Sequence, residues 1–246
     1  MITGAAGGVG AVASRDFCEH GAEVIGIDVD ADRGNDLAQE LRAEGHRFQF
    51  RKVDLTSSAD VVAVAQIVER EWPGLDVLLN NAAIVKAAPV LETTDDEWDT
   101  IQAVNLRGVF LTTRELGRLM VGRHGSIINV ASNAGLVGFE TMSAYCASKG
   151  GVIAFTRACA MDFAPDVRVN AICPGVIDTA MPHAFTAGLP DEEAKAAYWE
   201  TFREGHLLRR IARPEEIVAM ARFLASDEAS FVTGAAISVD GGWTTK

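Results

Sequence analysis

Short apolar runs alternate with longer amphipathic stretches along this chain of 246 residues, and that alternation most constrains its fold. The runs predict strands at 22–27, 48–53, 75–79, 126–130, 167–172 and 236–239. Helical spacing of apolar residues predicts helices at 33–43, 59–70, 97–121, 143–163 and 215–224. Strands joined through helices make right-handed crossovers and therefore run parallel. The sequence predicts an α/β protein with a doubly wound parallel sheet in three layers, α/β/α.

No linker, repeat or low-complexity tract divides the chain, so residues 1–246 are expected to form a single domain. The alternation stops between residues 180 and 206. Pro182, Gly188 and Pro190 precede a charged stretch of helical character there. We expect this insertion to form a flap over the substrate.

The N-terminus holds a glycine-rich turn, with Gly4, Gly8 and Gly10 in the spacing G-x-x-x-G-x-G. Glycine lets backbone N–H groups approach a pyrophosphate, and the following helix directs its positive end at the same charge. Only residues 1–3 precede the turn, where a buried strand is expected. The first strand therefore looks truncated, and we expect the natural protein to begin several residues earlier.

Asp28 closes the second predicted strand, 24 residues after Gly4. An acid at this place can bond both hydroxyls of an adenosine ribose and repel a 2′-phosphate. No Arg or Lys follows it directly, and Gly7, before the second motif glycine, is not basic. The pattern favours NAD over NADP.

Composition excludes several other classes of protein. The formal net charge of −12 argues against nucleic-acid binding, which needs a basic face. The sequence contains no uninterrupted run of about 18 apolar residues, so no membrane span is predicted. The cysteines, which are scattered without a C-x-x-C pair, predict free thiols in a reducing cytosol; they are Cys18, Cys146, Cys159 and Cys173. The histidines have no ligand spacing, so no metal is expected.

Tyr145 and Lys149 lie four residues apart in a predicted helix, so both side chains project from one face. A phenol titrates near pKa 10, too high for a base at neutral pH. A neighbouring ammonium stabilises the phenolate and lowers that pKa, which makes tyrosine a usable proton carrier. Taken alone, the pair is common by chance, and a core tyrosine with a solvated lysine is its default interpretation.

Together these motifs resemble the classical short-chain dehydrogenase/reductase family over nearly the whole chain. Ser132 and Tyr145 are thirteen residues apart, as in that family. The matching pieces are TGAAGGVG at 3–10, Asp28, VDL at 53–55, NNAA at 80–83, VNL at 104–106, INVAS at 128–132, YCASK at 145–149, PGVIDT at 174–179 and the tail VTGAAISVDGG. The resemblance implies a Rossmann-like fold.

The resemblance also implies residue roles. Tyr145 would exchange a proton with the substrate oxygen, and Lys149 would lower its pKa and bind the nicotinamide ribose. Ser132 would hydrogen-bond the substrate oxygen, and Asn105 would hold a water that links Lys149 to solvent. The residues implied to bind the cofactor, besides Tyr145 and Lys149, are Gly4, Gly8, Val9, Gly10, Asp28, Asp54, Leu55, Asn81, Ala82, Ala83, Pro174, Gly175, Ile177 and Thr179. Ala83 departs from the family, which usually has glycine there, and we expect function to survive.

The candidate substrate walls are mostly apolar: Asn133, Ala134, Leu136, Val137, Phe139, Met142, Ile177, Met181, Phe185, Tyr198 and Phe202. They predict an uncharged, hydrophobic secondary alcohol or ketone as the substrate, cyclic or steroid-like. The other interpretation is that these side chains only pack the flap against the body of the protein. The alternatives are a 3-oxoacyl-thioester reductase using NADPH and a non-catalytic dinucleotide-binding sensor or scaffold. The resemblance implies a homotetramer built through the helices at 97–121 and 143–163.

Overall fold

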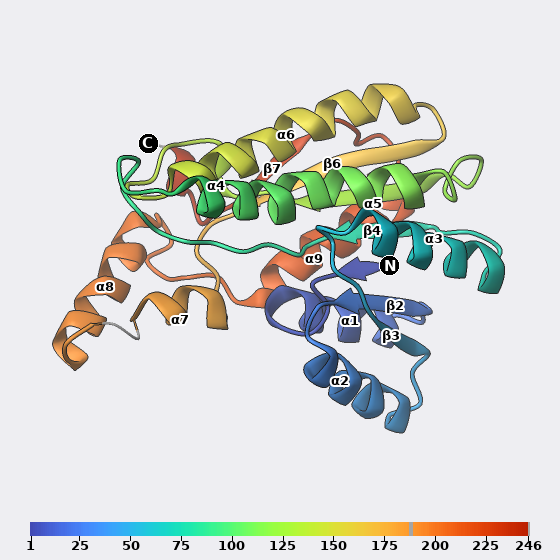
Figure 1. Cartoon of the computed structure of the whole chain (residues 1–246), viewed down its shortest axis with the longest axis horizontal. Helices are drawn as coiled ribbons and strands as arrows, with labels where there is room; N and C mark the ends of the chain where they lie inside the picture. The colour runs from blue at the N-terminus through green and yellow to red at the C-terminus, as the bar shows by residue number, and fades with distance from the viewer. Residues whose placement is uncertain (187–188, 246) are drawn as a thin grey trace.

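The computed structural model describes residues 1–186 and 189–245. Within them, seven strands form one parallel sheet in the order β3-β2-β1-β4-β5-β6-β7 (Figure 1). The strands are β1 Ile2–Thr3, β2 Val24–Asp28, β3 Phe48–Lys52, β4 Val77–Asn80, β5 Gly125–Val130, β6 Val167–Pro174 and β7 Ala236–Val239. The predicted doubly wound parallel sheet is confirmed. Each of the six strands predicted from residue 22 onward begins and ends within two residues of the predicted positions.

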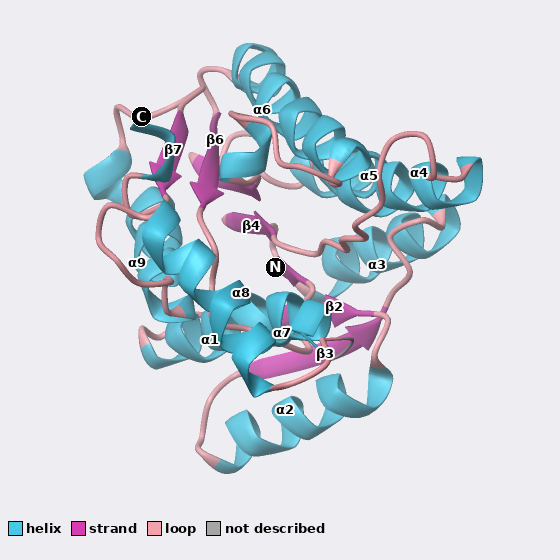
Figure 2. Cartoon of the chain, turned by 90° about the vertical axis from the view of Figure 1, so that its left-hand side faces the viewer, coloured by secondary structure: helices cyan, strands magenta, loops and turns pink. Residues whose placement is uncertain are grey.

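Helices cover both faces of the sheet, which gives the predicted three layers (Figure 2). One face carries α1 Gly8–Glu19, α2 Ala31–Ala43 and α9 Pro214–Ala225, whose apolar sides share one core cluster with the sheet. The other face carries α3 Ser58–Glu71, α5 Gly108–Gly117 and α6 Ser143–Phe163, which build a second cluster. The sheet is therefore buried from both sides, as its nearly continuous apolar strands require.

The short strand β1 lies at the centre of the sheet. Ile2 pairs with Gly26 of β2 on one side and with Leu79 of β4 on the other. The backbone of Met1 extends this ladder, because its nitrogen donates to the Val77 carbonyl (2.6 Å) and its carbonyl accepts from Leu79 (2.9 Å). Chain connections leave β1 and β4 toward opposite edges of the sheet, so a ligand crevice opens beyond their carboxyl ends.

The prediction of a single helix at 97–121 is wrong. The structure has α4 Asp95–Gln102, a π-helical turn at Ala103–Arg107 and then α5. The amide of Asn105 bonds the backbone of Ile84 in both directions, accepting from its N–H and donating to its carbonyl (both 2.8 Å). The π turn, closed by a bond from Gly108 N–H to the Ala103 carbonyl, accommodates this side chain between α4 and α5.

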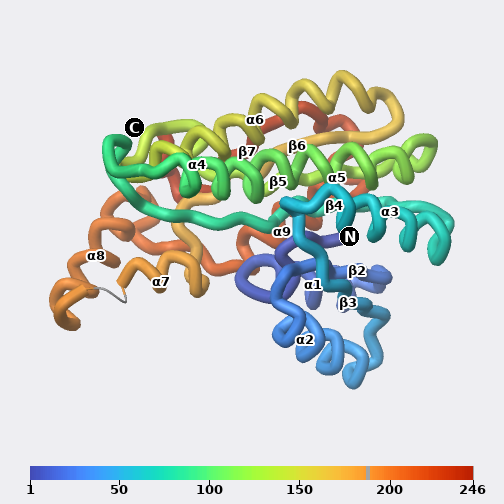
Figure 3. Tube along the Cα trace, in the orientation of Figure 1, coloured from blue at the N-terminus to red at the C-terminus, as the bar shows by residue number. Residues whose placement is uncertain are grey.

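The segment 180–206 projects from the body as α7 Ala180–Thr186 and α8 Glu192–Gly205 (Figure 3). Residues 187–188, which include Gly188, lie outside the described residues. Short 3₁₀ turns complete the fold at Asn133–Gly135 (η2), Asp227–Ala229 (η3) and Trp243–Thr245 (η4). No described helix is long and apolar enough to cross a membrane.

Candidate active site

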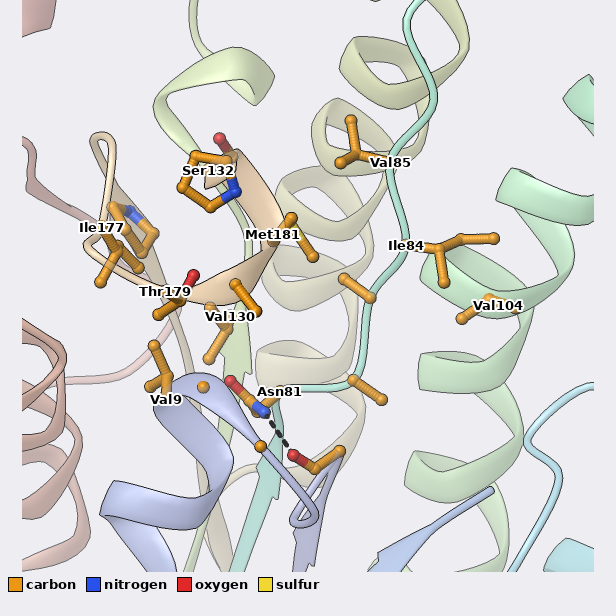
Figure 4. Close-up of a pocket in the computed structure, with 18 of the residues that line it drawn as sticks. Val9, Asn81, Ile84, Val85, Val104, Val130, Ser132, Ile177, Thr179 and Met181 are labelled. Carbon is orange, nitrogen blue, oxygen red and sulfur yellow. Dashed lines mark hydrogen bonds between the residues drawn. The ribbon is translucent and has the colours of Figure 1, made fainter. Parts of the chain in front are cut away.

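A cavity of about 500 Å³ opens at the carboxyl ends of the strands. Its walls come from the glycine turn, the loop after β4, the end of β5, the start of α6 and the segment after β6. Figure 4 shows Val9 and Asn81 at one end of this space and Met181 with Val85 farther along it. The cavity therefore lies where parallel sheets of this type bind ligands.

The glycine turn is shaped for close approach of backbone to a ligand. Gly4 and Gly8 have left-handed φ angles of +66° and +53°. A Cβ on Gly10 would lie 2.0 Å from the Gly4 carbonyl oxygen, so no side chain fits there. Helix α1 begins at Gly8, and its capping residue, Gly7, has no side chain to satisfy the first N–H groups. These exposed donors at a helix N-terminus fit a pyrophosphate.

Hydrogen bonds fix the turn to the loop after β4. The Thr3 hydroxyl accepts from the backbone N–H groups of Asn81 (2.9 Å) and Ala82 (3.0 Å). The Asn81 amide donates back to the carbonyls of Thr3 (3.1 Å) and Gly4 (3.3 Å). The two segments implied to contact the adenosine half of a dinucleotide thus form one rigid unit.

Asp28 lines the cavity at the end of β2. Its carboxylate accepts from the N–H groups of Ala6 (3.0 Å) and Asp30 (3.1 Å), which aims it across the turn. Arg33 also lines this end, close to Gly7, and pairs with Asp30 at 3.5 Å. Arg33 follows Asp28 by five residues, so the sequence pattern around Asp28 gave no indication of it. Arg33 and Asp30 carry opposite charges, so the three side chains together have a net charge of −1, which is that of Asp28.

The predicted catalytic side chains Ser132, Tyr145 and Lys149 all line the same cavity. Lys149 is only 1% exposed, and its ammonium donates to the Val130 carbonyl at 2.7 Å. Burial lowers the pKa of Lys149 from 10.5 to about 8, because the charged form loses hydration. The Lys149 nitrogen lies 5.8 Å from the centre of the Tyr145 ring.

The expected lowering of the Tyr145 pKa is absent in the ligand-free protein. Burial raises the pKa of Tyr145 to about 12, and the Ser132 hydroxyl offsets only part of that rise. Desolvation of the phenolate is the largest cause, and the Lys149 ammonium donates to Val130 while lying 5.8 Å from the centre of the phenol ring.

Asn105 is fully buried in the π turn, behind the cavity. Its amide bonds Ile84 and also donates to the Ser148 hydroxyl at 3.2 Å, which in turn donates to the Tyr145 carbonyl. Asn105 therefore ties the loop after β4 to the helix that carries Tyr145. Its water-holding role stays a prediction.

His206, which is not among the predicted site residues, holds the segment after β6. His206 is 1% exposed; its Nδ1 donates to the Phe202 carbonyl (2.6 Å), and its Nε2 accepts from the Val176 N–H (3.3 Å). A Cβ on Gly175 would lie 2.5 Å from Nε2. The end of α8 is thus fastened to the segment implied to hold the nicotinamide. A histidine without ligand spacing gives no sequence signal of this kind.

Most predicted residues meet in the cavity. The predicted cofactor residues in its walls are Gly4, Gly8, Val9, Asp28, Asp54, Leu55, Asn81, Ala82, Ala83, Tyr145, Lys149, Pro174, Gly175, Ile177 and Thr179. Gly10 lies behind the turn instead. Among the described residues other than glycine, left-handed φ occurs at His124, Thr141 and Arg209, so Ala83 avoids the backbone strain that would require glycine.

The remaining end of the cavity is apolar. Nine of the proposed substrate-wall residues line it: Asn133, Ala134, Phe139, Met142, Ile177, Met181, Phe185, Tyr198 and Phe202. Leu136 and Val137 were expected there and are not; they are 41% and 37% exposed outside the cavity. Ile84, Val85 and Val104 also line the cavity and were missed (Figure 4). Ile84 and Val85 belong to the loop after β4, which carries no periodic pattern, and Val104 belongs to the π turn, which was predicted as part of one regular helix.

Comparison with known proteins agrees with this geometry. A family model described as "Enoyl-(Acyl carrier protein) reductase" matches residues 4–244. The chain is 39% identical over 246 residues to cyclopentanol dehydrogenase of Comamonas testosteroni, covering 99% of this chain and 96% of that protein. It is 37% identical over 244 residues to the 3-oxoacyl-(acyl-carrier-protein) reductase FabG of Thermotoga maritima, covering 98% of this chain and 96% of FabG.

Among solved structures, ligand-free aldohexose dehydrogenase of Thermoplasma acidophilum superposes with a TM-score of 0.90. It is 31% identical, and the match covers 100% of this chain and 93% of that one. These likenesses span the glycine turn, the helix that carries Tyr145 and the segment after β6 alike. The chain belongs to the short-chain dehydrogenase/reductase family.

Proposed function

We propose that the chain oxidises an uncharged, apolar secondary alcohol to a ketone with NAD, and catalyses the reverse with NADH. In broader terms it is an oxidoreductase acting on the CH–OH group of secondary alcohols. One observation carries the narrower proposal: apart from Ser132 and Asn133, the described cavity walls beside Tyr145 are mostly apolar, and Lys149 is the one charged side chain among them. Such walls favour an uncharged substrate.

The preference for NAD rests on Asp28. A carboxylate there can accept both hydroxyls of an adenosine ribose, whereas a 2′-phosphate would bring a second negative charge beside it. When bound, the nicotinamide ring supplies the chemistry by accepting a hydride from the carbinol carbon or returning it. The protein supplies the position of the substrate and the path of the proton.

Tyr145 removes the alcohol proton as the hydride leaves. Its pKa of about 12 in the ligand-free protein is too high for this work, so added positive charge must lower it. The Lys149 ammonium, which is mostly protonated at pH 7 with a pKa of about 8, supplies part of that charge. Lys149 would be joined in this by the positive charge of an oxidised nicotinamide when that ring is bound. Ser132 donates to the substrate oxygen and stabilises its developing charge.

The segment 180–206 serves as the substrate flap in this proposal, because Met181, Phe185, Tyr198 and Phe202 turn inward from it. A ring fits these broad apolar walls, and the relative from Comamonas testosteroni is named for a cyclic alcohol. We further propose that residues 1–246 act as one domain, and that four copies assemble through α4–α5 and α6 in a reducing cytosol.

The main alternative is a 3-oxoacyl-thioester reductase using NADPH, which the likeness to FabG keeps open. Asp28 argues against it, because the carboxylate would repel the 2′-phosphate. The catalytic set argues against a non-catalytic sensor. Burial of the Lys149 ammonium destabilises the fold, and a sensor would gain nothing from it.

The test is a rate screen of cyclopentanol, cyclohexanol, linear secondary alcohols, glycerol and a hydroxy acid, each with NAD and NADP. A 3-oxoacyl thioester with NADH and NADPH completes the screen, and all rates are followed by absorbance at 340 nm. The proposal expects the highest kcat/KM with NAD and a cyclic alcohol. Faster reaction of NADPH with an oxoacyl thioester supports the alternative, and NAD binding without any turnover supports the sensor.

A further inference from the structure

We propose that Asn133 is a positioning residue whose side-chain amide directs the hydroxyl proton of Ser132 toward the substrate oxygen. This inference rests on the role of Ser132 proposed above. Asn133 follows Ser132 directly, begins the 3₁₀ turn η2 and lines the cavity, with only 4% of its surface exposed. Its place beside the catalytic serine is therefore fixed by packing.

The Ser132 hydroxyl makes two hydrogen bonds in the ligand-free protein. It accepts from the Ala134 N–H at 3.0 Å and donates to the Asn133 Oδ1 at 3.1 Å. A serine hydroxyl has one proton and two lone pairs. While this proton is on Asn133 Oδ1, Ser132 can donate neither to the Tyr145 oxygen, whose pKa its hydroxyl lowers, nor to a substrate oxygen.

The nitrogen of the same amide has no partner. Among the described residues, three buried side-chain polar atoms lack a hydrogen bond: Asn133 Nδ2, Ser143 Oγ and Arg168 Nη1. Of these residues, Asn133 alone lines the cavity. A buried N–H without an acceptor is unfavourable. Turning the amide gives this nitrogen an acceptor in Ser132 Oγ at the cost of the bond to Oδ1, and a bond is gained when the freed Ser132 proton finds the substrate oxygen.

A half-turn of the amide about χ2 exchanges its oxygen and nitrogen without changing its shape. Nδ2 would then donate to Ser132 Oγ. That bond and the one from Ala134 would fill both lone pairs of the hydroxyl. Ser132 could then act only as a donor, with its proton released toward the substrate. The two donors would also polarise the hydroxyl and strengthen its bond to developing negative charge.

The experiment is a double-mutant cycle on the NAD-bound enzyme, with Asn133→Leu, Ser132→Ala and the double variant. Asn133→Leu is expected to lower kcat about tenfold, equivalent to about 1.4 kcal/mol, with the Kd for NAD within twofold of the parent. In the Ser132→Ala background the same change should have no further effect on kcat, because Asn133 acts through Ser132. Ser143→Ala, which removes another buried unpaired group, is the matched control and should keep the parental kcat.

Asn133→Asp adds a second readout. An ionised carboxylate can only accept, so it would hold the Ser132 proton and lower kcat at neutral pH. As pH falls and the carboxyl gains a proton, it can donate and kcat should recover relative to the parent.

A kcat for Asn133→Leu within twofold of the parent overturns the inference, as does a pH profile for Asn133→Asp parallel to that of the parent. So does an equal loss from Asn133→Leu with and without Ser132, which would mean a merely structural role. If Ser132→Ala itself keeps parental turnover, the proposed role of Ser132 fails first, and the two failures are thus distinguishable.

Discussion

Replacing Lys149 with methionine should remove a pH-dependent loss of stability. The folded protein releases the Lys149 proton near pH 8, because burial lowers its pKa, whereas the unfolded chain holds that proton up to about pH 10.5. The unfolded state binds more protons between these values, so the free energy of unfolding rises with pH there. The destabilisation is complete below pH 8 and absent above pH 10.5.

The magnitude follows from the same two pKa values. The shift from 10.5 to about 8 corresponds to about 3 kcal/mol of instability in acid and neutral solution. Integrated from pH 7 to pH 9, the parent should gain roughly 1.3 kcal/mol, and Lys149→Met should lack this gain. The lost hydrogen bond to Val130 lowers the stability of the variant equally at each pH and leaves its slope untouched.

The assay is urea unfolding at 25 °C, followed by tryptophan fluorescence at pH 7, 8 and 9. The pH range ends at 9 because burial raises the pKa of three thiols to about 11; they are Cys18, Cys159 and Cys173. Above pH 9 these thiols lower the free energy of unfolding as pH rises, which is opposite to the effect of Lys149. Lys52→Met, at an exposed lysine, is the control and should keep the parental slope. Equal slopes for the parent and Lys149→Met would refute the reasoning.

Three further predictions concern the cofactor. Asp28→Asn should raise kcat/KM with NADP relative to NAD about tenfold or more, since one like-charge contact at about 4 Å costs roughly 1–4 kcal/mol; an unchanged ratio in initial-rate assays would speak against the role of Asp28. Gly10→Ala should weaken NAD binding at least tenfold by calorimetry, because its Cβ would lie 2.0 Å from the Gly4 carbonyl oxygen. Gly138→Ala is the control, since its Cβ would lie in open space, and equal NAD affinities of the two variants would reject the argument. His206→Leu should raise the KM for NAD several-fold by leaving the Val176 N–H without its acceptor, and an unchanged KM would show that the contact is dispensable.

Much of the fold could be predicted because its signals are local. The helix at 143–163 and the strand at 236–239 have the predicted ends, since each is set by its own apolar pattern. The motif residues meet in one cavity because parallel strands deliver their carboxyl ends to the same edge.

The missed features depend on contacts between distant segments. The π turn exists because Asn105 bonds Ile84, 21 residues away, and no periodicity records that contact. His206 matters through Val176 and Phe202, which the sequence gives no reason to join. The pKa of Tyr145 also escaped prediction, because spacing gives the neighbouring charge but not the depth of burial.

The most direct test of the central claim is a single-turnover measurement with Tyr145→Phe. NADH formation from NAD and a secondary alcohol should be followed at 340 nm, with the Kd for NAD measured on the same protein. We predict that the hydride-transfer rate falls by about 10²–10⁴-fold while the Kd stays within about threefold, because only the proton carrier is lost. A rate within a few-fold of the parent would contradict the assignment of Tyr145.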